Sequence, residues 1–111
     1  MAQNIVIGTY TGTGAAINVP VGFVPDYVEV YNVTDGDDKW EWFSSMTDGH
    51  ALYTRSVTDN LTTGLAGMSR ITANGVTPYA GSTTASKGFT IGTALSESTK
   101  VFAYKAVRNE D

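Results

Sequence analysis

The side chains best able to do chemistry in this chain are a group of carboxylates and a single histidine. Asp35, Asp37 and Asp38 lie close together, and clustered carboxylates are typical calcium ligands. The spacing of a calcium loop, with its glycine and distal Glu, is missing, so a solvated turn is predicted instead. His50 has Asp48 as its nearest carboxylate and no cysteine to join it. A hydrogen-bonded loop histidine is therefore favoured over a zinc site or a catalytic triad.

Two further patterns associated with catalysis or phosphate binding are incomplete. Glu29, Glu41 and Glu97 lie in separate segments, and no acid–base pair is visible among them. The Gly-x-Gly at residues 12–14 is not followed by a helical pattern that could present its N-terminus to a phosphate. The sequence thus predicts a non-enzymatic protein with no catalytic residues, bound metal or cofactor.

The composition indicates an all-β protein. The 12 Gly, 16 Thr and 8 Ser make up about a third of the 111 residues, and helix-forming residues are few. This length suits one domain, and a hydrophobic content of 41% suffices for one two-layer core. We therefore expect residues 1–111 to form a single antiparallel β-sandwich that is jelly-roll-like.

Charge and apolar runs argue against two classes of partner. The net charge is −4 and the basic residues are scattered, so no positive stripe is available for nucleic acid. Apolar runs are short, so no membrane span is predicted. Residues 1–5 lack the charged leader and apolar run of a signal peptide, and the absence of cysteine fits synthesis in a cytoplasm.

The segment 22–33 organises the predicted fold. A Gly-Phe-x-Pro corner leads into a strand in which Val28 and Val30 face one side and the alternate residues face the other. Phe23 is placed to close the end of the sandwich. Pro25, which has no backbone donor, is expected to begin the strand.

The N-terminal segments predict a hairpin. Residues 4–10 and 15–19 are both rich in β-branched residues and are separated by a Thr/Gly cluster. Ile5, Ile7 and Ile17 are expected to face inward, although a register shift of one residue would exchange the two faces.

An aromatic strand is expected after a second turn. Asp-Gly at residues 35–36 predicts that turn, and Trp40 and Trp42 share one face of the strand at 40–46. Paired tryptophans indicate either core or an interface, because each carries a large apolar area. Further strands are expected at 51–57, 87–93 and 99–107. Within the last, residues 101–107 are apolar on both faces apart from Lys105, as in a strand central to a sheet or covered by a subunit.

The middle of the chain is less regular. Residues 58–68 predict a long connection in which one short helical turn is possible. Asn-Gly at residues 74–75 marks a turn. Residues 78–86 are small and polar, which predicts an exposed loop able to contact a neighbour.

Two distant motifs together resemble small β-sandwich domains of tailed-bacteriophage virions. The motifs fall within residues 17–107 and consist of Gly22, Phe23, Pro25, Val28, Val30 and Asn32, then Gly88, Phe89, Ile91, Gly92, Tyr104, Lys105 and Ala106. The resemblance implies a small virion protein made in the host cytoplasm. It implies first a capsid decoration (cement) protein that binds and stabilises the outer head surface, commonly as a homotrimer, and it carries over no catalytic residue.

The mechanism expected of such a protein is passive burial of surface against other proteins. Its partners would be identical copies and the major capsid protein or another virion protein. The alternatives are a tail or fibre component, or a carbohydrate-binding module for host attachment that would use the six Tyr, two Trp and the acidic turn. The candidate contact residues are Ile5, Val6, Ile7, Trp40, Trp42, Pro78 and Tyr79.

Overall fold

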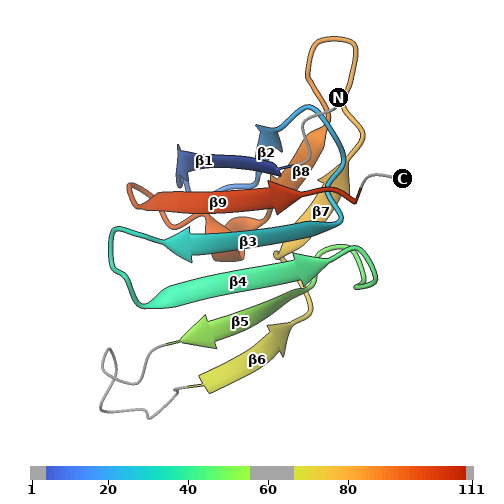
Figure 1. Cartoon of the computed structure of the whole chain (residues 1–111). Coiled ribbons are helices and arrows are strands. Elements are labelled where there is room, and N and C mark those ends of the chain that lie inside the picture. Colours follow the sequence, from blue (N-terminus) through green and yellow to red (C-terminus); the bar gives the residue numbers. More distant parts are fainter. Residues whose placement is uncertain (1–4, 56–66, 110–111) are drawn as a thin grey trace.

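Two antiparallel sheets pack against each other in the computed structural model, which describes residues 5–55 and 67–109 (Figure 1). Within these residues, the larger sheet has six strands in the order β1-β9-β3-β4-β5-β6, and the smaller has three in the order β2-β8-β7. The predicted β-sandwich is confirmed. The elements are β1 (Ile5–Thr11), β2 (Ile17–Pro20), β3 (Tyr27–Asn32), β4 (Asp38–Phe43), β5 (Ala51–Arg55), β6 (Gly67–Ile71), β7 (Val76–Tyr79), β8 (Gly88–Ile91), the 3-10 turn η2 (Thr93–Leu95) and β9 (Val101–Val107).

The connections divide into crossings and a meander. The chain changes sheet between β1 and β2, β2 and β3, β6 and β7, and β8 and β9, whereas β3 to β6 follow one another within the larger sheet. The repeated crossings are shared with jelly rolls. The meander and the unequal sheets differ from the paired Greek keys of that fold.

The N-terminal hairpin expected from residues 4–10 and 15–19 is wrong. β1 pairs with β9 in the larger sheet, and β2 pairs with β8 in the smaller one. The connection between β1 and β2 is bonded to the segment that precedes β9. The amide of Gly12 donates to the carbonyl of Lys100 at 2.8 Å, and the amide of Gly14 donates to the carbonyl of Ser96 at 2.6 Å. β9 lies between β1 and β3, which confirms its prediction as a central strand.

The faces of β1 are the reverse of those expected. Ile5 and Ile7 are 45% and 75% exposed, while Val6 and Tyr10 pack against the core. Tyr10 stacks on Phe102 with ring centroids 5.2 Å apart, and its hydroxyl donates to the carbonyl of Leu95 at 2.8 Å. The large aromatic ring with a satisfied hydroxyl decides the inner face, because burying it removes more apolar area than burying an isoleucine.

The core lies between the sheets and follows the predicted alternation. Val28 and Val30 of β3 point inward as expected, and Phe23 is 3% exposed at the corner that precedes them. Pro25 is fully buried but precedes β3 by two residues, so it does not begin the strand. The buried hydrophobic residues are Val19, Phe23, Val28, Val30, Trp40, Trp42, Ala51, Val76, Phe89, Ile91, Leu95, Phe102, Tyr104 and Ala106.

The remaining expectations are met in part. The turn at 74–75 is confirmed, with Asn74 at a φ of 62°. Pro78 and Tyr79 belong to β7 and pair with Phe89 and Gly88, so the loop expected at 78–86 begins only at residue 80. β7 is an edge strand, where a proline costs no ladder bond. Residues 58–66, most of the long connection and its possible helical turn, lie outside the described residues.

The predicted turn between β3 and β4 is organised by Asn32, which is 1% exposed. Its Oδ1 accepts bonds from the amides of Thr34 at 3.1 Å and Asp35 at 3.0 Å, and its Nδ2 donates to Asp35 Oδ2 at 3.0 Å. Gly36 completes the turn at a φ of 74°. The side chain therefore replaces the backbone partners that the hairpin end lacks.

Replacing Asn32 with alanine is expected to lower the free energy of unfolding by about 2 kcal/mol, because partly buried amides lose their acceptor. Urea denaturation followed by circular dichroism measures this loss. The control is Asn18→Ala at an exposed position of β2, where the Asn18 side chain accepts from Thr90 Oγ1 at 2.6 Å. Its expected loss is below about 0.5 kcal/mol. Equal losses in the two variants would contradict the role given to Asn32.

Candidate interaction surface

The outward side of the six-stranded sheet gathers the exposed apolar side chains of the described residues. Six of them lie on strands, where the register places them on the side opposite the core, as Phe43 is opposite to Trp42 and Val101 to Phe102. The seventh, Val33, lies in the turn after β3. We call the side opposite the core the outer face. The exposed large hydrophobic residues are Ile5, Ile7, Tyr31, Val33, Phe43, Met68 and Val101.

The strand register arranges the outer face in rows across β1, β9, β3 and β4 (Figure 1). One row is apolar throughout and consists of Ile5, Val107, Tyr27 and Phe43. The rings of Tyr27 and Phe43 lie 4.9 Å apart between centroids. A continuous apolar row across four strands is unusual on the solvent side of a sheet, where polar residues normally alternate with the buried ones.

The neighbouring row is charged and contains Ile7, Lys105, Glu29 and Glu41. The two carboxylates lie directly opposite each other on β3 and β4, an arrangement that repels. The hydroxyl of Tyr27 lies between them, 2.7 Å from Glu29 Oε2 and 2.8 Å from Glu41 Oε2. A phenol has one proton to donate, so it can donate to only one of the two at a time. Lys105 lies opposite Glu29 on β9, and Lys39 Nζ lies 3.9 Å from Glu41 Oε1, so the centre of the outer face carries charges of both signs.

Burial and hydrogen bonding affect several phenols. Desolvation raises the pKa of Tyr10, and desolvation together with bonds to Glu29 and Glu41 raises that of Tyr27. The pKa of Tyr53 is raised by desolvation and by its bond to Asp38. In each case the folded chain favours the protonated phenol.

Raising the pH above about 10 is therefore expected to lower the stability of the fold. Unfolded tyrosines ionise near that pH while these folded ones stay neutral, so the stability they contribute is complete below it and is lost as the pH rises toward their folded pKa. Denaturant midpoints measured across the alkaline range test this. Tyr10→Phe should make the fall shallower, and a midpoint that does not change with pH would contradict the prediction.

The predicted contact residues divide between the two sheets. Ile5 and Ile7 lie on the outer face, whereas Val6 turns toward the core. Trp40 and Trp42 are 5% and 1% exposed and lie in the core, so the interface role considered for them is wrong. Trp40 packs against Tyr53 and Phe102 of the same sheet, with ring centroids 5.3 and 6.0 Å apart. The half-buried residues Pro78 and Tyr79 belong to the smaller sheet, away from the outer face.

Sequence reasoning missed Tyr27, Phe43 and Lys105 as surface candidates. The signal lay in the alternation, because Phe43 must face outward once Trp42 is assigned to the core. The same argument places Lys105 outward between the buried residues Tyr104 and Ala106. These assignments depend on knowing which face the second sheet covers.

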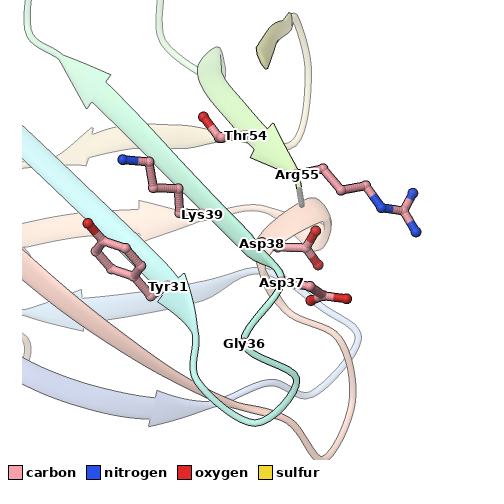
Figure 2. Close-up of a pocket in the computed structure, with 7 residues that line it drawn as sticks. All are labelled: Tyr31, Gly36, Asp37, Asp38, Lys39, Thr54 and Arg55. Carbon is pink, nitrogen blue, oxygen red and sulfur yellow. The ribbon is translucent and has the colours of Figure 1, made fainter. Parts of the chain in front are cut away.

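An open pocket of about 230 Å³ lies at the end of the β3–β4 hairpin (Figure 2). Figure 2 shows that Tyr31 and Lys39 lie on one side of the hairpin and the acidic side chains and Arg55 on the other, so the polar groups do not converge. Lys39 Nζ lies 5.7 Å from the centroid of the Tyr31 ring, where a sugar would stack. The pocket therefore gives no support to the carbohydrate alternative. Its lining residues are Tyr31, Gly36, Asp37, Asp38, Lys39, Thr54 and Arg55.

The carboxylates of the acidic turn bind other parts of the protein. Asp35 Oδ1 accepts from Lys100 Nζ at 3.1 Å, and this bond raises the pKa of Lys100. Asp38 Oδ1 accepts from the hydroxyl of Tyr53 at 2.7 Å. Within residues 5–55 and 67–109, no three His, Cys, Asp or Glu side chains are grouped so that they could hold a metal ion. His50 lies in a turn, where its amide donates to the carbonyl of Thr47 at 3.1 Å.

The fold and the outer face define a class of protein, a β-sandwich with one apolar and charge-patterned side. Comparisons with protein families, with characterised proteins and with solved structures find no match. In the part of the chain that the structure describes, no helix is long and apolar enough to cross a membrane.

Proposed function

We propose that this protein is a non-enzymatic structural protein of a bacteriophage virion, a capsid decoration protein that binds the outer surface of the head and stabilises it. The observation that carries the proposal is the outer face, where the strand register places six of the seven exposed large hydrophobic residues of the described chain. Contiguous exposed apolar surface of this kind marks protein–protein contact sites. The assignment to a virion is supported by the resemblance of the two motifs.

The proposed mechanism is passive attachment. A sheet whose reverse side is fixed by an aromatic core holds its outer side chains in place before binding, which reduces the entropy lost on association. The sandwich then contributes interface free energy to a lattice of repeated subunits without any chemical step. The partners proposed are identical copies of this chain and the major capsid protein or another virion protein.

Several motif residues have structural roles that suit a repeated, rigid virion component. Asn32 holds the β3–β4 turn, and Phe23 closes the core. Phe89 and Ile91 are fully buried between the sheets. Most motif residues therefore build the sandwich, whereas Lys105, between the buried residues Tyr104 and Ala106, lies on the outer face.

The test is to purify virions of the phage that encodes this chain, separate heads from tails and quantify the chain by mass spectrometry. Many copies in the head fraction, and heads that lose heat resistance when the gene is deleted, are the expected results. The control is a known internal head protein, whose copy number should not change on deletion. Recovery only with tails would favour the tail or fibre alternative, and absence from virions would overturn the proposal.

A further inference from the structure

We propose that the outer face binds a second copy of this chain about a two-fold axis that runs parallel to the strands and passes between β9 and β3. The inference deepens the proposed function, since it rests on the outer face being a contact surface. It names a partner for the part of that face formed by β1, β9, β3 and β4, which we call the pairing patch. It replaces the trimer that the resemblance implies.

The strand order determines which elements meet. A two-fold axis along the strands exchanges positions on its two sides and leaves each row at the same height. In the order β1-β9-β3-β4, β9 of one copy therefore covers β3 of the other, and β1 covers β4. The contact is isologous, so every pair of residues occurs twice.

The apolar row is self-complementary in this arrangement. Val107 covers Tyr27 of the second copy, and Ile5 covers Phe43 of the second copy. Ile5 and Phe43 are 45% and 44% exposed in the single chain, so both have apolar area left to bury. At the opposite end of the patch, Val101 of β9 is 37% exposed and pairs with Thr11 of β1.

The charged row is complementary at its two central positions, while at its ends Ile7 covers Glu41 of the second copy. Lys105 of one copy covers Glu29 of the other, and the symmetry repeats this pair. Glu29 lies opposite Glu41, and both accept from the hydroxyl of Tyr27 or lie within hydrogen-bond distance of it. Within residues 5–55 and 67–109, Lys105 forms no ion pair, so its ammonium group is available to a second copy.

The same charges disfavour two other arrangements. An axis between β3 and β4 would place Glu29 on Glu41 of the second copy. An axis across the strands through the charged row would place Lys105 on Lys105 and Glu29 on Glu29. Like charges facing each other at an interface cost several kcal/mol, and the axis between β9 and β3 avoids both contacts.

The area of the pairing patch is sufficient for a weak dimer. Four strands spaced about 4.8 Å apart and seven residues of about 3.3 Å each cover about 19 by 23 Å. Counting both copies and the relief of the side chains, the accessible area buried is on the order of 1,000 Å², near the lower limit of specific interfaces. We therefore expect a dissociation constant in the micromolar range.

Sedimentation velocity and light scattering, from low micromolar to several hundred micromolar protein, test the pairing. The wild-type chain should shift from monomer to dimer. Lys105→Glu and Glu29→Lys should each place like charges at both symmetry-related contacts. Each contact raises the dissociation constant about tenfold, so either variant should weaken dimerisation about a hundredfold. The double variant should return to within about tenfold of the wild type, since the swap restores both opposite-charge pairs.

Two further variants make the test specific. Lys87→Glu reverses an exposed lysine just before β8, outside the pairing patch, and should leave dimerisation unchanged. Ile5→Ser should weaken dimerisation about tenfold through lost apolar burial, and it preserves the test should a charge variant fail to fold by circular dichroism.

A chain that stays monomeric, a trimer, or a dimer insensitive to Lys105→Glu would overturn the inference. Virion analysis separates this result from the proposed function. A monomer that is abundant on heads would contradict the dimer but not the proposed function. A dimer that is absent from virions would contradict the proposed function but not the dimer.

Discussion

Replacing Trp42 with alanine is expected to lower the free energy of unfolding by about 3–5 kcal/mol. The indole is 1% exposed and lies on β4 opposite Val28, against the inner side of the smaller sheet. Its Nε1 donates to the carbonyl of Thr47 at 3.4 Å. Truncation removes the largest fully buried side chain, leaves a cavity and deprives that carbonyl of its donor. Since small domains have only about 5–15 kcal/mol in total, the variant should be close to unfolding.

Urea denaturation of dilute protein, followed by circular dichroism, measures this loss free of any association. The control is Phe43→Ala, which truncates the adjacent aromatic residue on the outer face, where it is 44% exposed. That variant should lose less than about 1 kcal/mol while weakening dimerisation. Similar losses from the two variants would mean that Trp42 does not lie in the core, and would make the whole inside–outside assignment of β4 wrong.

The strands best predicted from the sequence are those whose inner face carries large apolar residues at every second position. Val28 and Val30 define β3 in this way, and Phe102 and Tyr104 define β9. Alternation succeeds there because burial on one side and solvent on the other impose a period of two. The turn at residues 35–36 was predictable for a local reason, since Asp-Gly suits its backbone geometry.

The pairing of β1 could not be predicted for a physical reason. Its partner β9 lies at the other end of the chain, and apolar residues occupy both faces of Ile5–Ile7, so local pattern gives neither partner nor register. Likewise, the area of Trp40 and Trp42 can be covered by a second sheet or by a second protein. The outer face becomes a candidate site only after the tryptophans are seen to be buried in the core.

Replacing Gly88 with alanine is expected to cost about 3 kcal/mol or more, although it adds a single methyl group. The new Cβ would clash with the carbonyl oxygen of Val19 in β2. Gly88 pairs with Pro20 at this point, so the obstacle is the backbone of the neighbouring strand and no rotamer change can relieve it. Moving β2 away would separate Val19, 4% exposed, from Phe89, which is fully buried. At a compatible site, replacing glycine with alanine stabilises a protein by about 0.4–1 kcal/mol. The clash with the Val19 carbonyl is therefore the reason why this substitution is expected to destabilise the fold.

The control is Gly36→Ala, where a Cβ would meet nothing within 4 Å but the backbone has a φ of 74°. That variant should lose only about 1 kcal/mol, the cost of the left-handed conformation. Denaturation measures the loss of unfolding free energy in both variants. In Gly88→Ala, hydrogen exchange should be faster for the amides of β2 and β8 than for those of the β3–β6 meander. If Gly88→Ala were as stable as the wild type, β2 and β8 could not approach as described. The motif residue Gly88 would then have no structural explanation. The support that the motif at residues 88–92 gives to the virion proposal would be weaker.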